Sequence, residues 1–100
     1  MSKNNYAIRK DGKKIFCKTT MCPTGILAVD FYLPKAGFSI MWRRDAHVHI
    51  SKVRNSMDGR KTIVRYMVHP SLWLGESFNT PKYACLQEVL NSIVDSYICI

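Results

Sequence analysis

The stretch ILAVDFYL, residues 26–33, decides how this chain folds. It is dense in Val, Ile, Phe and Tyr, the residue types that are enriched in β-strands. The segments on either side, residues 21–25 and 33–37, each contain a proline and a glycine. Proline presets the backbone angle φ and glycine permits a positive φ, so both segments are typical of turns. The sequence therefore predicts a strand bounded by two turns.

Four further short runs of alternating apolar residues surround this strand. They are residues 13–20, 38–44, 47–54 and 61–69. The segment between the last two runs, residues 55–59, is the clearest hairpin loop in the chain because it ends in Asp58-Gly59. Residues 1–12 are charged and end at the turn dipeptide Asp-Gly, so we expect a weakly ordered lead-in there. Five runs joined by tight turns predict an antiparallel meander over residues 13–69.

A helical period replaces the alternating one near the end of the chain. Thr80-Pro81 is a good helix start, because Thr can cap free N–H groups and proline is tolerated in the first turn. Apolar residues then recur at helical spacing, at Leu86, Val89, Leu90, Ile93, Val94 and Tyr97. This stripe predicts an amphipathic helix over residues 81–97, packed on one face of the sheet. We therefore expect a single α+β domain over residues 1–100.

Charge is distributed unevenly along the chain. Residues 1–65 carry fourteen basic and four acidic side chains, whereas residues 66–100 carry one basic and three acidic side chains. The isoelectric point is about 9.6. This balance favours an anionic partner such as nucleic acid, anionic lipid or an acidic protein. No stretch approaches the roughly 18 apolar residues that a membrane-spanning helix needs, so no membrane partner is expected.

Alternation assigns the residues of each strand to one of the two faces of the sheet. The residues expected under the helix are Leu27, Val29, Phe31, Leu33, Phe38, Ile40, Trp42, Val48, Ile50, Val64, Tyr66 and Val68. The opposite face is basic and holds aromatic rings. Phosphates attract Lys and Arg, and unpaired bases stack on exposed rings, so we expect this face to engage nucleic acid or a nucleoprotein. The predicted contact residues are Lys14, Phe16, Lys18, Tyr32, Arg43, His49 and Arg65.

Two other interpretations of the sequence remain open, one for this face and one for another surface. An antiparallel sheet often keeps one polar face in water, and that face then has no ligand. The chain also fits a protein-binding inhibitor or adaptor, such as a virus-encoded accessory factor that docks on an acidic host protein. In that case Leu72 and Trp73 would supply the contact together with the hydrophobic edge of the helix, because tryptophan is a frequent hot-spot residue at interfaces.

A short segment near the C-terminus resembles a known family. Residues 83–90, Tyr-Ala-Cys-Leu-Gln-Glu-Val-Leu, are similar to the second helix of Src-homology phosphotyrosine-binding domains, whose pattern is Phe-x-x-Leu-x-x-Leu-Val. Residues 40–45 can be aligned with the phosphate-binding strand of that family, which places Arg43 at its arginine. The resemblance implies a phosphotyrosine-peptide-binding module as a further alternative. It departs from the family at residues 26–33, where a first helix would fall and a strand is predicted.

Motifs that carry catalysis or metal binding are missing from the sequence. His47 and His49 point to the same side of a strand and His69 could join them, but no Cys and only one carboxylate, Asp30, could be a further zinc ligand on that face. There is no Gly-x-Ser-x-Gly elbow and no glycine-rich phosphate loop. We therefore expect a protein without enzymatic activity, metal or cofactor, and the sequence leaves its oligomeric state open.

The cysteines favour an intracellular protein, either cytoplasmic or nuclear. They are Cys17, Cys22, Cys85 and Cys99, and their spacing matches no zinc motif. The polar start of the chain does not resemble a secretory signal, so reduced thiols are expected.

Overall fold

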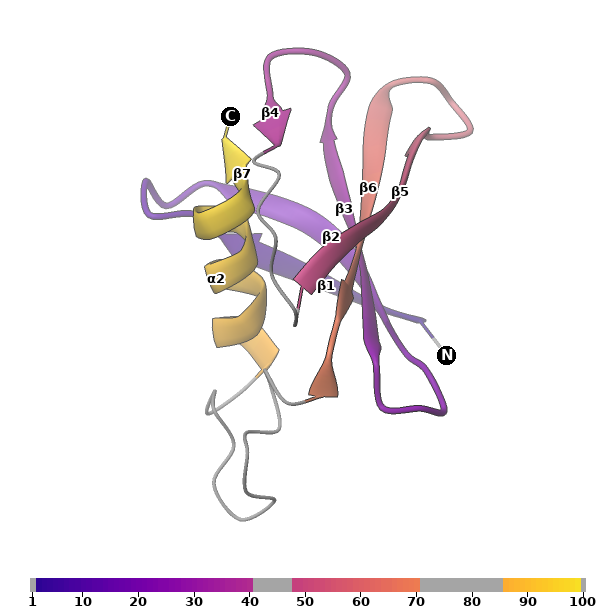
Figure 1. The fold of residues 1–100 in the computed structure, drawn as a ribbon. Helices are drawn as coiled ribbons and strands as arrows, with labels where there is room; N and C mark the ends of the chain where they lie inside the picture. Colours follow the sequence, from indigo (N-terminus) through magenta and orange to yellow (C-terminus); the bar gives the residue numbers. More distant parts are fainter. Residues whose placement is uncertain (1, 41–47, 71–85, 100) are drawn as a thin grey trace.

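The fold places one helix against one face of an antiparallel sheet. The computed structural model describes residues 2–40, 48–70 and 86–99. Its elements are β1 (Ser2–Ile8), β2 (Lys14–Met21), β3 (Leu27–Pro34), β4 (Ser39–Ile40), β5 (Val48–Asn55), β6 (Lys61–Val68), α2 (Leu86–Tyr97) and β7 (Ile98–Cys99). The main sheet has the order β1-β2-β3-β6-β5, and every neighbouring pair in it is antiparallel (Figure 1). The predicted α+β architecture, with five antiparallel strands and a C-terminal helix, is confirmed.

The hydrophobic core lies between α2 and the sheet. The buried helix residues are Val89, Leu90, Ile93, Val94 and Tyr97, so the predicted apolar stripe faces the core. The predicted inward residues of β3 and β6 are all buried, and Val48 of β5 joins them. Phe38, Ile40 and Ile50 are half-buried and pack against the same cluster. The named inward residues that the structure describes therefore all face the core, and Trp42 lies outside the described residues.

The prediction of a weakly ordered lead-in over residues 1–12 is wrong. Strand β1 pairs with β2 along its whole length, from Ser2 opposite Thr20 to Ile8 opposite Lys14. Asp11-Gly12 is the tip of the hairpin that joins them: Gly12 has φ of 87° and its N–H donates to the Arg9 carbonyl over 2.9 Å. A polar edge strand lacks the residue types that identify a buried strand, so only the turn dipeptide marked it in the sequence.

The polar stripe of α2 hydrogen-bonds the free edge of β1 near its C-terminal end, at Tyr6 and Ile8, and also Lys10 just beyond the strand. Its three side chains, Gln87, Asn91 and Asp95, are spaced four residues apart and therefore share one side of the helix. The Ile8 N–H donates to Asn91 Oδ1 (2.8 Å), Gln87 Nε2 donates to the Tyr6 carbonyl (2.6 Å), and the Lys10 N–H donates to Asp95 Oδ1 (3.2 Å). Unpaired groups on a sheet edge recruit other strands, so this cover also protects the edge.

The predicted third strand, residues 38–44, does not belong to the main sheet. Ser39 and Ile40 pair instead with Cys99 and Ile98 in a separate two-stranded sheet, which brings β4 beside the C-terminus (Figure 1). The place beside β3 is taken by β6, and β5 forms the edge. The arrangement is therefore not a simple meander, and its fifth strand comes from β1. Residues 41–44 lie outside the described part of the chain.

The predicted loop at residues 55–59 is confirmed as the hairpin between β5 and β6. Gly59 has φ of 70°, and its N–H donates to the Ser56 carbonyl. The described part of α2 begins at Leu86, so the predicted start at Thr80-Pro81 lies outside the described residues. Within the described ranges, no helix has the length and apolar character needed to cross a membrane.

The first prediction concerns the core. Leu90 is fully buried between helix and sheet, so Leu90→Ala should lower the free energy of unfolding by about 2–5 kcal/mol. Denaturant melts of both proteins measure this difference. A loss below about 0.5 kcal/mol would show that the stripe is not part of the core.

The second prediction concerns the covered edge of β1. Asn91→Ala removes the acceptor for the Ile8 N–H, so the free energy of unfolding should fall by about 1 kcal/mol. The Ile8 amide should also exchange faster with solvent, which hydrogen-exchange NMR measures. Ser96→Ala, on the same helix, serves as the control. Equal exchange of the Ile8 amide in both variants would contradict the role of Asn91.

Candidate nucleic-acid interface

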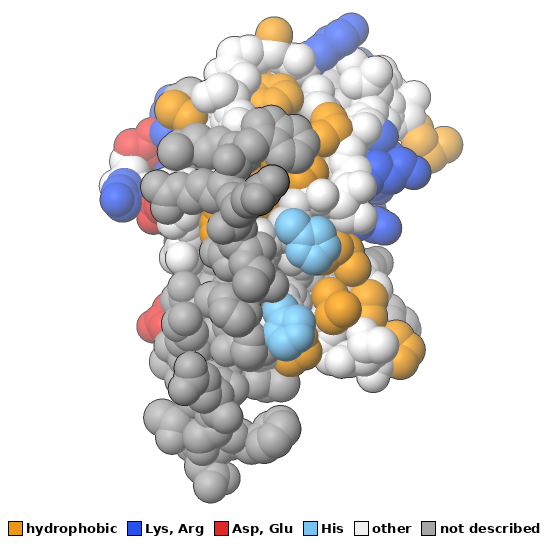
Figure 2. All heavy atoms as spheres, viewed as in Figure 1, with side chains coloured by type: hydrophobic (Ala, Val, Ile, Leu, Met, Phe, Trp, Pro, Cys, Tyr) orange, Lys and Arg blue, Asp and Glu red, His pale blue; other side chains and the backbone are white. Residues whose placement is uncertain are grey.

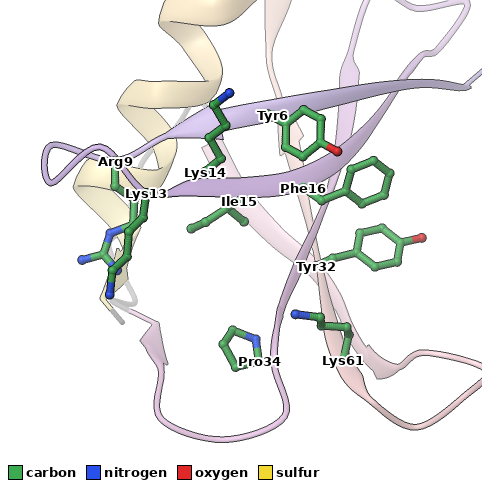
Figure 3. Close-up of a pocket in the computed structure, with 9 residues that line it drawn as sticks. All are labelled: Tyr6, Arg9, Lys13, Lys14, Ile15, Phe16, Tyr32, Pro34 and Lys61. Carbon is green, nitrogen blue, oxygen red and sulfur yellow. The ribbon is translucent and has the colours of Figure 1, made fainter.

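Three aromatic rings form a row across the face of the sheet that points away from α2. Tyr6 of β1 lies directly opposite Phe16 of β2, and their ring centroids are 5.5 Å apart. The Phe16 ring lies 5.1 Å from the ring of Tyr32 on β3. Figure 3 shows the three rings one after another across neighbouring strands. We call Tyr6, Phe16 and Tyr32 the aromatic row.

The aromatic row is accessible to a ligand. Tyr6 is 52% exposed, and Phe16 and Tyr32 are half-buried. The ammonium of Lys18 lies 5.7 Å from the centroid of the Tyr32 ring, within the range of a cation–π contact. Three predicted contact residues, Phe16, Lys18 and Tyr32, are thus brought together. Tyr6 was not predicted as a site residue, because the strand that carries it was taken for a lead-in.

A pocket of about 540 Å³ opens beside the aromatic row. It is lined by Tyr6, Arg9, Lys13, Lys14, Ile15, Phe16, Tyr32, Pro34 and Lys61 (Figure 3). These lining residues, all in the described part of the chain, include four basic side chains and no acidic one. Lys14 was predicted as a contact residue. Arg9 and Lys13 were missed with the hairpin that carries them, and Lys61 reaches the pocket because β6, not the third run, pairs with β3.

A second pocket of about 500 Å³ lies on the other side of Tyr32 and Lys61, which line both pockets. Its remaining walls come from Arg54, Ile63 and the hairpin residues 55–58. This hairpin loop is internally bonded: the Ser56 hydroxyl donates to Asp58 Oδ1 over 2.6 Å and the Arg60 N–H donates to the same oxygen over 3.0 Å. The hydrogen bond from Ser56 holds the pKa of Asp58 below its usual range.

Arg65, a predicted phosphate contact, is held by a carboxylate. Its Nε donates to Asp30 Oδ1 over 2.7 Å and a terminal nitrogen donates to Asp30 Oδ2 over 3.0 Å, so the contact is bidentate. Arg54 donates to the same Oδ2 over 3.3 Å. One carboxylate therefore joins β3, β6 and β5 on this face and compensates one of the two arginine charges. We call Asp30, Arg54 and Arg65 the Asp30 cluster.

The charges of the Asp30 cluster determine the ionisation of its carboxylate. Burial alone would raise the pKa of Asp30, since the residue is only 9% exposed. The hydrogen bonds and positive charges of Arg65 and Arg54 outweigh that effect, so the pKa lies below the usual value for Asp. The bonds to Asp30 in turn raise the pKa of Arg65.

Arg54 reaches this face because β5 contains a bulge. Ile50 pairs with Tyr66 but Lys52 pairs with Arg65, so Ser51 is an extra residue in the strand. Strict alternation from Val48 and Ile50 would place positions 52 and 54 under the helix. The bulge turns both toward the outer face instead. Burial of the Lys52 and Arg54 charges under the helix would be costly. The presence of these two charged residues at positions that strict alternation turns inward was therefore the sequence signal for the bulge.

Other predicted contact residues are not near the aromatic row or are not described. His49 is exposed on β5, opposite Met67 of β6, and β6 separates its strand from β3. Figure 2 shows the two described histidines at the surface, with Lys and Arg toward the margins of this view. Arg43, Leu72 and Trp73 lie outside the described residues. No group of three His, Cys, Asp or Glu side chains suited to a metal occurs in the described ranges.

Cys17 is buried in the core, and burial raises the pKa of its thiol to about 12, so it stays protonated at neutral pH. Cys17, Cys22 and Cys99 are free thiols, and Cys85 lies outside the described residues.

Comparison with known proteins gives this surface no relative: no protein-family model, curated protein or solved structure matches the chain. The resemblance to Src-homology domains meets a structural difference at residues 27–34, which form strand β3 where that family has its first helix.

The third prediction concerns the Asp30 cluster. Asp30→Asn removes the carboxylate charge from two arginines, so the free energy of unfolding at pH 7 should fall by about 1–2 kcal/mol, because both arginines are partly exposed. The pKa of Asp30 is lowered on folding, so ionisation stabilises the native state above the unfolded pKa of about 4. That contribution is lost as the pH falls through the lower folded pKa.

Urea melts of both proteins across this pH range measure the effect. The difference between wild type and Asp30→Asn should be constant from neutral pH to about pH 5 and should shrink in more acidic solution. A difference that does not change with acidification would contradict an ionised carboxylate in the cluster.

Proposed function

We propose that this protein binds single-stranded nucleic acid through the aromatic row and the lysines around it. The observation that carries the proposal is the position of three accessible rings in sequence across β1, β2 and β3, with Lys14, Lys18 and Lys61 beside them. Bases stack on such rings whatever their sequence, and lysines neutralise the phosphates between them.

The proposal specifies a single strand because of the rings. The bases of a duplex are stacked on each other and present only their edges in the grooves, whereas unpaired bases expose their faces to aromatic side chains. Tyr6 is the most accessible ring of the row and lies on β1, an edge strand of the sheet. An aromatic row with no attached charge would fit a protein partner equally well, but the lysines favour a polyanion.

The proposal includes a binding role without enzymatic activity and an intracellular location, both on the sequence grounds given above. The alternative of a protein-binding adaptor relies on Leu72 and Trp73, which are not described, and on the helix edge. The apolar residues of α2 from Val89 to Tyr97 are buried against the sheet, so they offer no contact surface. The phosphotyrosine alternative relies on Arg43, which is also not described. No observation favours either one over the polyanion.

The fourth prediction tests the rings and the charges separately by fluorescence anisotropy with a short single strand. Tyr6→Ala should weaken binding by about 1–3 kcal/mol, whereas Tyr6→Phe, which keeps the ring, should bind like the wild type. Neither change should alter the salt dependence, because stacking releases few ions. The double variant Lys14→Ala with Lys61→Ala should flatten the slope of log K against log salt by about 1.4, at about 0.7 for each lost phosphate contact.

Lys52→Ala removes one charge and supplies the control for each pocket lysine, because Lys52 lies on the same face but on the far edge strand and lines neither pocket. It should keep the slope and affinity of the wild type. If Lys52→Ala weakens binding as much for each lost charge as the Lys14→Ala, Lys61→Ala double variant does, the attraction is a general effect of the basic face. Absence of binding at about 50 mM salt would refute the proposed function.

A further inference from the structure

The line of the aromatic row continues past Tyr32 to the other edge of the sheet. Tyr32 of β3 lies directly opposite Ile63 of β6, and Ile63 lies directly opposite Arg54 of β5. Residues that are directly opposite in neighbouring antiparallel strands share one face of the sheet. One line of side chains therefore crosses all five strands on the outer face, namely Tyr6, Phe16, Tyr32, Ile63 and Arg54.

The 500 Å³ pocket lies along the second half of this line, and we call it the hairpin pocket. Tyr32, Ile63 and Arg54 line it together with Lys61 and the loop residues 55–58. Tyr32 and Lys61 also line the 540 Å³ pocket, so the two pockets adjoin at a shared wall. A single strand that lies on the aromatic row and continues past Tyr32 therefore enters the hairpin pocket.

The charges of the hairpin pocket favour a base over a phosphate. Its one acidic lining residue, Asp58, has a pKa below the usual range and is therefore ionised at neutral pH. Arg54, one of its two basic lining residues, already donates to Asp30. The 540 Å³ pocket, in contrast, has four basic lining residues and no acidic one among the described residues. A phosphate beside Asp58 would be repelled, whereas an uncharged base would not.

Met57 gives the hairpin pocket an exposed apolar side chain on a well-held loop. It is the most exposed large hydrophobic residue in the described part of the chain. The Ser56 N–H donates to the Lys61 carbonyl and the Gly59 N–H donates to the Ser56 carbonyl, both over 2.9 Å, and the Lys61 N–H donates to Ser56 Oγ over 3.0 Å. A thioether makes favourable contacts with aromatic rings, so the loop presents a preorganised contact for the face of a base.

We propose that the hairpin pocket is a further base subsite, in which Tyr32 and Met57 contact the base that follows those on the aromatic row. Lys61, on the shared wall, neutralises the phosphate between this base and the preceding one. This inference rests on the proposed function and extends it with a path: the single strand crosses the sheet from β1 toward the hairpin that joins β5 and β6.

The fifth prediction concerns the length of strand that the protein binds. Unlabelled thymine strands of about two, four, six and ten nucleotides compete with one labelled strand in fluorescence anisotropy. Met57→Ala should bind the shortest strand like the wild type, because that strand occupies only the aromatic row. It should bind the longest strand about threefold to tenfold more weakly, because the contact with the additional base is lost.

Met21→Ala is the matched control, because Met21 is an exposed methionine of β2 that lines neither pocket. It should bind strands of every length like the wild type. Thermal melts check that both variants are folded. A second measurement uses the unaltered protein with methyl-labelled methionine: the longest strand should shift the NMR signal of the Met57 methyl group and leave that of Met21 in place.

Each outcome decides the inference. If Met57→Ala binds all lengths like the wild type and the Met57 signal does not move, the subsite is refuted and the proposed function stands. An equal loss at every length would overturn the path from the row to the hairpin. A Met57 signal that shifts with protein concentration alone would assign the loop to a contact between two copies of the chain. A failure of every strand to bind would overturn the inference and the proposed function together.

Discussion

The burial of alternate residues of β3 under α2 is the interaction on which the rest of the structure depends. Val29, Phe31 and Leu33 are completely buried, and they lie at the centre of the sheet against the apolar stripe of the helix. Side chains alternate along a strand, so this burial turns Asp30 and Tyr32 to the outer face. The same constraint that forms the core thereby places one residue of the Asp30 cluster and one ring of the aromatic row.

The outer face contains two neighbouring areas with different chemistry. The Asp30 cluster is a set of satisfied charges that joins three strands, so its arginines stabilise the sheet before they meet any ligand. The aromatic row and its pocket hold lysines that pair with no described carboxylate. Tyr32 lies at the boundary between the two areas. Asp30, two residues before it on the same face of β3, belongs to the Asp30 cluster, whereas the Tyr32 ring belongs to the aromatic row. A count of basic residues on this face would merge the two areas and overestimate the charge available to a phosphate.

The helix supports the candidate site although it lies on the opposite face. Its apolar stripe packs on the core, and its polar stripe bonds the free edge of β1 through Gln87 and Asn91. Tyr6 lies on that edge strand, and its own carbonyl accepts one of these bonds. The most exposed ring of the row is therefore carried by a backbone held from both sides, by β2 and by α2. A rigid support of this kind reduces the loss of conformational entropy that accompanies binding.

The sequence by itself determined the fold class, the inward residues of β3 and β6, and the placement of Phe16, Lys18 and Tyr32 on the same outer face. These features follow from the period of the apolar residues, which is a local property of the chain. Only the tertiary structure placed β1, which is polar and gains its stability from pairing with β2 and bonding to α2. Only the structure revealed the bulge at Ser51, and with it the turn of Arg54 toward Asp30. The local sequence pattern also did not predict the strand order. The neighbour of β3 is β6 and not β4, and this order brings Lys61 to the pocket. Each of these features depends on contacts between residues far apart in the chain, which a local period does not encode.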